Sequence, residues 1–357
     1  MPIALDATYS IGRNLSGVGV YSRAILFGLA RAHPEERFQF CYRPHRFLRS
    51  FRDSLPRNAG RRLLSGIPRA RLFHALNQRV DAPSTRRGLG QRGAGGTKVV
   101  STFHDLFVLA GDYSSLEFRA RFAAQAREAA ARSDMIIAVS QFTASQVVEL
   151  LGIESSRIRV VHHGVHVPLP LPVPVADADP PRRENLVLSV GAIQRRKNTA
   201  RLVKAFEAMP QGWRLALAGS PDGYRAAEEL EAVEKSPRRA DIAVMGYVNE
   251  TELDDLYRRA SIVAFPSLDE GFGFPVLEAM AHGVPVVASN RSAVPEVAGN
   301  AAILVDPFET GAIADALDRL ASDPQLREDL AQHGRERARE FTWESAVEKT
   351  WRVYAET

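Results

Sequence analysis

Residues 265–298 read FPSLDEGFGFPVLEAMAHGVPVVASNRSAVPEVA. In this stretch a buried apolar run ends near Pro266, a loop containing Gly271 and Gly273 follows, and Pro275 opens an expected helix. Proline is tolerated at a first helical position because that N–H would lack a partner anyway. Glycines let the backbone approach a ligand closely, and free amides at a helix start can hold anionic or hydroxyl oxygens. The stretch therefore predicts a ligand site at a strand end, where open α/β sheets hold their ligands.

Short apolar runs rich in Val, Ile and Leu alternate with helix-patterned stretches along the rest of the chain. Continuous apolar runs are typical of strands buried on both faces, as in parallel sheets. Because twelve such strands are too many for one sheet, we expect two doubly wound α/β domains. The expected strands are 3–5, 38–42, 72–74, 99–103, 135–139, 158–161, 186–190, 214–218, 242–245, 262–265, 285–288 and 302–305. The expected helices include 114–132, 199–209, 250–259, 310–321 and 324–340.

A proline-rich segment separates the two halves. Residues 168–181 read PLPLPVPVADADPP. Each proline fixes φ and lacks an N–H donor, so this segment is excluded from central strands and helix interiors. We therefore expect an N-terminal acceptor-side domain at 1–167, an interdomain linker at 168–181 and a C-terminal donor domain at 182–340. The aromatic-rich residues 341–357 predict a helix packed near the interdomain groove.

The composition is that of a soluble globular protein. Of 357 residues, 45% are hydrophobic and 25% are charged, and no run approaches the roughly 18–20 apolar residues of a membrane span. The N-terminus has no secretory signal pattern. The only cysteine, Cys41, rules out an internal disulfide framework, so we expect a cytoplasmic protein.

Positive charge is concentrated in one stretch. Nine arginines lie between Arg43 and Arg71 against one acid, Asp53, although the net charge is only +4. Such a stretch can hold a nucleic acid, an anionic membrane or a phosphorylated substrate, or be a solvated surface segment. Without zinc-finger spacing or an RNP-like motif we expect no nucleic-acid partner. Peripheral contact with an anionic membrane through 43–71, on the cytoplasmic face of the inner membrane, is the functional alternative.

Two carboxylates flank the glycine loop. Glu270 and Glu278 can reach two hydroxyl-bearing parts of one extended ligand. With GFGFPVL between them, they resemble the E-x7-E motif of the retaining GT-B glycosyltransferases, glycosyltransferase group 1. The likeness continues through AMAHGVPVVAS and SAVPEVAGNAAILVDP, and upstream through SVGAIQRRKNTARLVKAF and VMGYVNETELDDLYRRASIVAFPS. It implies the GT-B fold, two Rossmann-like, doubly wound parallel-sheet domains facing across a cleft.

The resemblance also implies roles for individual residues. Glu270 contacts hydroxyls of the transferred sugar, and Glu278 holds the ribose of the nucleotide. Arg196 and Lys197 contact the pyrophosphate, and His104 sits near the reacting sugar. The remaining donor-binding positions are a turn at Gly17 and Gly19, the base-side Tyr247 and Val248, and the backbone at Gly271, Phe272, Gly273, Phe274, Pro275 and Val276.

The chain departs from the family pattern in two places. Gly191 is followed by Ala192 rather than the arginine common in the family, so positive charge is expected from residues 195–197. The Asn-Gly-Val-Asp turn that closes the first domain reads instead His163-Gly164-Val165-His166. With His162, these histidines either bind a metal or are ordinary turn residues.

The function implied by the resemblance is a retaining hexosyltransferase that uses a nucleotide sugar. No cofactor and no metal are implied, because arginine and lysine can stabilise the departing phosphate. The expected donor is GDP-mannose, with UDP-hexoses as the alternative. The expected acceptor is a saccharide or lipid-linked oligosaccharide of surface polysaccharide or lipopolysaccharide synthesis. A sugar-nucleotide epimerase of the same fold and a catalytically silent nucleotide-sugar-binding subunit are the other hypotheses.

Overall fold

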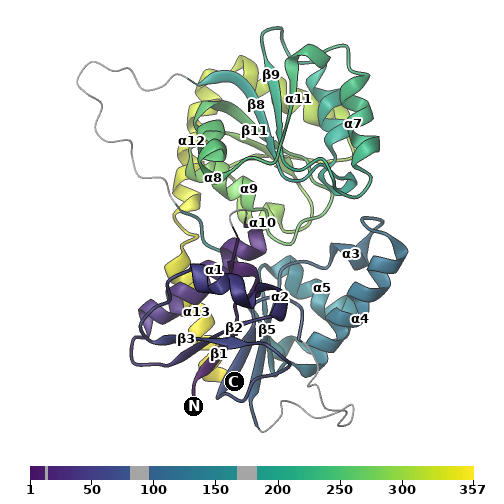
Figure 1. The fold of residues 1–357 in the computed structure, drawn as a ribbon. Coiled ribbons are helices and arrows are strands. Elements are labelled where there is room, and N and C mark those ends of the chain that lie inside the picture. The colour runs from purple at the N-terminus through teal and green to yellow at the C-terminus, as the bar shows by residue number, and fades with distance from the viewer. Residues whose placement is uncertain (13–14, 81–95, 167–182) are drawn as a thin grey trace, which may run out of the picture. The chain divides into compact units, whose positions relative to one another are not determined.

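The computed structural model describes residues 1–12, 15–80, 96–166 and 183–357 and divides into two compact units (Figure 1). Unit 1 comprises Met1–Gly164 and Phe341–Thr357, and unit 2 comprises Val165–Glu340. The expected linker at 168–181 lies outside the described residues. None of the helices in the described ranges combines the length and apolar character that crossing a bilayer requires.

Unit 1 contains a seven-stranded parallel sheet in the order β3-β2-β1-β4-β5-β6-β7. The central strand β1 pairs on one side through Ile3↔Phe38 and on the other through Ile3↔Leu72. All four residues of β1 are buried, as the apolar runs predict for a parallel sheet. The strands are β1 (Ile3–Asp6), β2 (Phe38–Tyr42), β3 (Ala59–Leu63), β4 (Leu72–Ala75), β5 (Lys98–Phe103), β6 (Met135–Ala138) and β7 (Ile158–Val160).

The helices of unit 1 include the last helix of the chain. This helix, α13 (Trp343–Glu356), packs on α1 (Gly17–Ala32) although it follows all of unit 2 in sequence. A Cβ atom at Gly28 of α1 would overlap Val347 Cγ2 of α13, so the contact is close. The other helical segments are η1 (Thr8–Ser10), α2 (Pro44–Phe47), η2 (Leu48–Arg52), α3 (Phe107–Ala110), α4 (Leu116–Arg132), α5 (Gln141–Leu151) and η3 (Ser155–Arg157).

Unit 2 contains a six-stranded parallel sheet in the order β10-β9-β8-β11-β12-β13. Its strands are β8 (Glu184–Val190), β9 (Arg214–Ala218), β10 (Ile242–Gly246), β11 (Ala260–Phe265), β12 (Val286–Ser289) and β13 (Ile303–Val305). Its helical segments are η4 (Arg195–Lys197), α6 (Thr199–Phe206), α7 (Ala226–Glu234), η5 (Arg239–Asp241), α8 (Glu250–Arg259), α9 (Phe274–Ala281), α10 (Val294–Ala298), α11 (Thr310–Ser322) and α12 (Pro324–Ala338).

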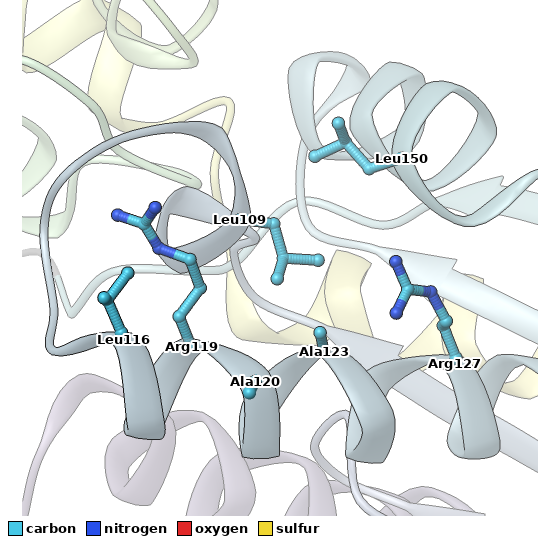
Figure 2. Close-up of a pocket in the computed structure, with 7 residues that line it drawn as sticks. All are labelled: Leu109, Leu116, Arg119, Ala120, Ala123, Arg127 and Leu150. Atoms are coloured by element: carbon cyan, nitrogen blue, oxygen red, sulfur yellow. The ribbon is translucent and has the colours of Figure 1, made fainter.

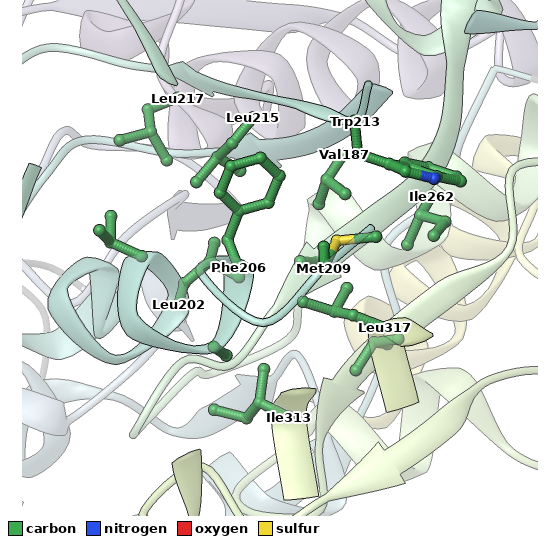
Figure 3. Close-up of a cluster of buried hydrophobic side chains, with 14 of the residues drawn as sticks. Val187, Leu202, Phe206, Met209, Trp213, Leu215, Leu217, Ile262, Ile313 and Leu317 are labelled. Atoms are coloured by element: carbon green, nitrogen blue, oxygen red, sulfur yellow. The ribbon is translucent and has the colours of Figure 1, made fainter. Parts of the chain in front are cut away.

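One hydrophobic cluster forms the core on one face of the unit 2 sheet (Figure 3). Leu215 of β9 and Ile262 of β11 pack with Phe206 of α6 and Leu317 of α11, and all four are fully buried. Helices α6 and α11 bury their apolar faces in this core and so cover the sheet whose carboxyl edge carries the site loops.

All twelve expected strands form, with ends shifted by at most two residues. One further strand, β3 (Ala59–Leu63), was not predicted. It is an edge strand whose residues are exposed or half-buried, so it has no continuous apolar run. It lies inside the arginine-rich stretch, so the interpretation of all of 43–71 as a solvated surface segment is wrong. Arg43, in particular, is buried in an ion pair with Asp6 at 3.0 Å.

Candidate active site

The parallel sheet of unit 2 has a switch point between β8 and β11, where the order in which the chain adds strands changes from one side of the sheet to the other. From this switch point the chain order runs outward through β9 and β10 on one side and through β12 and β13 on the other. Doubly wound sheets bind ligands beyond the strand ends at such a point. The segment after β8 holds η4, and the segment after β11 is the glycine loop, so the topology brings together two segments that the sequence singled out.

Three charged side chains meet at this switch point. Arg196 Nη1 lies 2.7 Å and Lys197 Nζ 2.6 Å from the same oxygen, Oε1 of Glu270. Arg196 Nη1 also donates to the Asp269 carbonyl oxygen. Both of these ion pairs use Oε1 of the Glu270 carboxylate. The structure thus brings three of the expected site residues into direct contact from two separate segments of the chain.

The two cations of the cluster set the ionisation of Glu270. Burial alone would raise the pKa of the Glu270 carboxyl, but the charges and hydrogen bonds of Arg196 and Lys197 lower it to about 2. Glu270 is therefore ionised at neutral pH. Arg196 and Lys197 place two positive charges at this strand end, which suits an anionic ligand such as a phosphate.

Asn198 fixes the cations against the end of β11. It adopts the left-handed conformation, with φ of 61°, and its buried Nδ2 donates to the carbonyl oxygens of Pro266 at 3.0 Å and Pro307 at 2.7 Å. The Leu268 N–H donates to the Arg196 carbonyl oxygen at 2.8 Å. These bonds explain the asparagine of the Arg-Lys-Asn triplet, because they set the position of the two preceding side chains.

A second loop holds the backbone of Glu270 and was missed at the sequence level. The Glu270 N–H donates to Ser292 Oγ at 3.0 Å, and the Ala293 N–H donates to the Glu270 carbonyl oxygen at 3.2 Å. Ser292 has φ of 56°, a conformation uncommon outside glycine. The loop after β12 thus positions Glu270, and only the tertiary fold reveals this contact.

The glycine loop leads into α9. Gly273 immediately precedes the helix with φ of 110°, a region that favours glycine, and Pro275 lies in the first turn as expected. Pro275 has no N–H, and the Val276 N–H donates to the Gly273 carbonyl oxygen at 3.1 Å. The rings of Phe272 and Phe274 pack edge to face, 5.5 Å apart.

Glu278 lies on α9 and is oriented by a residue that the sequence did not indicate. The Tyr257 hydroxyl, from α8, donates to Glu278 Oε2 at 2.8 Å. Burial raises the pKa of the Glu278 carboxyl, against the opposing effects of this hydrogen bond and of His282. The Tyr257 ring stacks on His282 at 4.9 Å. The carboxylate is thus held in place by one hydrogen bond.

The expected base-side residues follow the edge strand β10. Tyr247 is 51% exposed, and Val248 is half-buried. An exposed aromatic ring beside a half-buried valine offers a surface on which a planar base can stack.

His104 of unit 1 follows β5 directly and is buried. Its Nε2 lies 2.9 Å from the Leu76 carbonyl oxygen. Since a carbonyl oxygen only accepts, Nε2 carries the proton and Nδ1 of the neutral ring is an acceptor. Burial lowers the pKa of His104 to about 4 although this hydrogen bond raises it, so the ring is neutral at pH 7.

A buried aromatic cluster surrounds His104. The rings of His104 and His163 stack at 5.4 Å, and Tyr21 meets both edge to face at 4.8 Å. His163 is therefore a packing residue of the core. A chain of hydrogen bonds runs from Tyr21 to Thr102 at 2.8 Å, to His74 at 2.8 Å and to Tyr354 at 2.6 Å. Over the described ranges no three His, Cys, Asp or Glu side chains form a group that could hold a metal ion.

Gly17 and Gly19 are helical residues of α1, whereas the sequence predicted a turn outside any helix. They lie in the first turn of α1, where Ser16 Oγ accepts from the Gly19 N–H at 3.4 Å. A Cβ atom at Gly19 would lie 2.9 Å from the Tyr9 carbonyl oxygen. Close packing against the segment after β1 therefore explains this glycine.

A pocket of about 390 Å³ lies elsewhere in unit 1 (Figure 2). Leucines, alanines and two arginines of α3, α4 and α5 line it, among them Arg119 and Arg127, and none of the expected site residues contributes.

Two family matches together span most of the chain. Residues 176–337 match the glycosyl transferases group 1, and residues 8–167 match Glycosyltransferase Family 4. The boundary between the two matches falls within the proline-rich segment.

The relatives include glycosyltransferases of different specificity. The O-antigen chain mannosyltransferase B of Escherichia coli is 28% identical over 72% of this chain and 70% of its own length. A D-inositol 3-phosphate glycosyltransferase of Xylanimonas cellulosilytica is 33% identical over 63% of this chain and 58% of its own length.

Solved structures resemble the chain over its full length. Sucrose-phosphate synthase from Thermosynechococcus elongatus has a TM-score of 0.76 at 22% identity, covering 100% of this chain and 98% of its own. Anabaena Alr3699/HepE, solved in complex with UDP and glucose, has a TM-score of 0.72 at 15% identity, covering 100% of both chains. With the two parallel-sheet units, these neighbours confirm the expected GT-B fold.

Proposed function

The chain belongs to the glycosyl transferases group 1 and is a hexosyltransferase, and on that premise we propose that it is a retaining, metal-independent enzyme that transfers mannose from GDP-mannose to a saccharide acceptor. The observation that carries the proposal is the cluster of Arg196, Lys197 and Glu270 at the switch point of unit 2. It combines two positive charges with a carboxylate that can accept a hydrogen bond from a hydroxyl.

The cations supply the main chemical contribution. When the sugar–phosphate bond breaks, negative charge develops on the departing diphosphate. Arg196 and Lys197 are already ordered by Glu270 and Asn198, so they stabilise this charge without reorganising. The acceptor hydroxyl then attacks from the face that the phosphate leaves, and the departing phosphate helps to remove its proton. Neither glutamate forms a covalent bond in this scheme.

The two carboxylates have separate binding roles. The Glu270 carboxylate accepts a hydrogen bond from a hydroxyl of the transferred hexose. Glu278, which Tyr257 orients, accepts hydrogen bonds from the ribose hydroxyls. Tyr247 offers a stacking surface for the base. This division matches an extended ligand with a sugar at one end and a nucleoside at the other.

The choice of donor is supported by the relatives. The E. coli relative is a mannosyltransferase of the O-antigen chain, which favours GDP-mannose as the donor. It also favours an acceptor in surface polysaccharide or lipopolysaccharide synthesis, either a saccharide or a lipid-linked oligosaccharide. A UDP-hexose is the second candidate, because Alr3699/HepE was solved with UDP and glucose. A thermal-shift screen of GDP- and UDP-sugars separates the two, since the true donor stabilises the folded state by mass action.

Metal independence is part of the proposal, because two fixed cations can replace a divalent ion at the diphosphate. Transfer should therefore continue in excess EDTA. We also propose a cytoplasmic enzyme in peripheral contact with an anionic membrane, because the helical segment 44–52 combines arginines with Leu48 at 81% and Phe51 at 62% exposure.

The test is the transfer rate of three variants. Arg196→Ala, Lys197→Ala and Glu270→Gln should each lower kcat by about 10²–10³, the effect of removing one electrostatic contact to the transition state. Lys204→Ala is the matched control, because Lys204 is exposed and pairs with Glu207 on the surface of α6. Wild-type turnover in all three site variants would refute the assignment.

Two other functions make different predictions. A sugar-nucleotide epimerase would interconvert UDP-sugars without any acceptor, which NMR would detect. A silent nucleotide-sugar-binding subunit would bind the donor in calorimetry but give no turnover with any acceptor. The charge cluster favours the transferase over the silent subunit.

A further inference from the structure

Unit 1 has a switch point of its own, between β1 and β4. From these neighbouring strands the order runs outward through β2 and β3 on one side and through β5, β6 and β7 on the other. Ligands bind beyond the carboxyl ends of the strands at such a point. Asn77 lies two residues beyond the end of β4. It is therefore placed where this sheet is expected to bind a ligand.

The side chain of Asn77 is buried without hydrogen bonds. Only 6% of the residue is exposed, and neither Oδ1 nor Nδ2 has a partner within the described ranges. A carboxamide offers two N–H donors and one carbonyl acceptor, and leaving these groups unpaired in a folded protein is destabilising. Buried polar groups are normally paired, so a bound ligand is the natural source of the missing partners.

The residues on either side of Asn77 hold His104. The Leu76 carbonyl oxygen accepts from His104 Nε2 at 2.9 Å, and Gln78 Oε1 accepts from the His104 backbone N–H at 3.5 Å. Asn77 is thus fixed to the same strand edge as the expected catalytic histidine. The buried ring of His104 is neutral at pH 7, as is the carboxamide. Neutral donors and acceptors fit sugar hydroxyls better than phosphates.

We propose that the Asn77 carboxamide binds a pair of hydroxyls on the acceptor saccharide and so determines acceptor specificity. This inference rests on the proposed transferase function. The charged cluster of unit 2 suits the diphosphate of the donor, whereas the neutral carboxamide of Asn77 suits an uncharged sugar. One carboxamide can donate to one hydroxyl and accept from its neighbour, the arrangement that a vicinal diol presents.

The test compares Asn77→Leu with Asn58→Leu. Leucine is close to asparagine in shape but forms no hydrogen bonds. Asn58 is the matched control, because its Nδ2 donates to the Ala30 and His33 carbonyl oxygens, each at 3.0 Å. Kinetics are measured with the wild type's best acceptor among mono- and disaccharides of mannose, glucose and galactose.

Asn77→Leu should raise the acceptor KM about tenfold or more while leaving the donor KM near its wild-type value. Its melting temperature should equal or exceed that of the wild type, because no protein hydrogen bond is lost. Asn58→Leu should show the reverse, a lower melting temperature with an unchanged acceptor KM.

An unchanged acceptor KM in Asn77→Leu, or a fall in melting temperature as large as that of Asn58→Leu, would overturn the inference. These results differ from a failure of the proposed function, in which the wild type transfers no sugar to any member of the panel. In that case the melting temperatures alone still decide whether Asn77 has a structural role.

Discussion

The neutral histidines of unit 1 make its stability depend on pH. Burial lowers the pKa of His74 to about 3, that of His104 to about 4 and that of His163 well below its usual value. In the unfolded chain each titrates near 6.5. Unfolding below pH 6.5 therefore takes up protons, so stability is fully present above this pH and is lost as the pH falls towards 4.

His163→Asn should make the free energy of unfolding less dependent on pH. Each buried histidine contributes up to about 1.4 kcal/mol per pH unit to the slope of unfolding free energy against pH. The variant should lose roughly one such contribution between pH 6 and 4.5 in urea unfolding experiments. His45→Asn, at an exposed position, controls for the loss of an imidazole and should keep the wild-type slope. Parallel curves for His163→Asn and the wild type would contradict the neutral packing role of His163.

Single residues were predictable only where a motif marked them. Arg196, Lys197 and Glu270 stood in recognisable segments, and the structure places them in contact. Tyr257 and Asn77 were not found, because a tyrosine in an amphipathic helix and an asparagine after a strand are unremarkable until the fold shows what surrounds them. Their roles depend on contacts or unpaired atoms that local sequence does not encode.

At the scale of elements, α13 shows how a distant segment completes unit 1. It packs on α1 through the close approach of Gly28 and Val347, and Tyr354 bonds to His74 at 2.6 Å. Trp351 stacks on His33 with ring centroids 3.6 Å apart. The sequence indicated the helix and its aromatic face, but the partner of that face became clear only from the tertiary structure.

Gly28→Ala should destabilise the protein by about 1–3 kcal/mol, because the added methyl group overpacks the interface between α1 and α13. Val347→Ala in the same chain should recover part of this loss by removing the Cγ2 atom that the methyl group meets. The measurement is the free energy of urea unfolding of both single variants and the double variant. Strictly additive effects of the two substitutions would show that the helices do not meet at this point.

Strand β3 is the element that the sequence did not predict. Its partner β2 is a buried apolar run, whereas β3 reads Ala-Gly-Arg-Arg-Leu and needs only one neighbour at the edge of the sheet. Edge strands tolerate charge, which protects them from pairing with other chains. Apolar runs therefore predicted the other edge strands, β7, β10 and β13, and missed this charged one.

At the scale of the whole molecule, the proposed membrane contact predicts that the binding of the protein to an anionic bilayer depends on its surface charge. Arg49 and Arg52 are exposed beside Leu48 and Phe51. Each basic residue near an anionic bilayer adds about 1 kcal/mol of binding. Arg49→Glu with Arg52→Glu should therefore reduce flotation with anionic liposomes at least tenfold.

The matched control is Lys349→Glu with Arg352→Glu, which reverses two exposed charges on α13 of the same unit. This control should float with the liposomes as the wild type does. Raising the salt concentration should release both the control and the wild type from the liposomes. Wild-type protein that stays in the soluble fraction at low salt would remove the membrane contact from the account.

The central claim is that the switch point of unit 2 holds a nucleotide sugar by its diphosphate. A crystal structure of the chain with GDP-mannose or a UDP-hexose tests it most directly. We expect phosphate oxygens within about 4 Å of Arg196 and Lys197, with a sugar hydroxyl on Glu270 and the ribose on Glu278. A nucleotide sugar bound elsewhere, with this cluster unchanged and unoccupied, would contradict the claim.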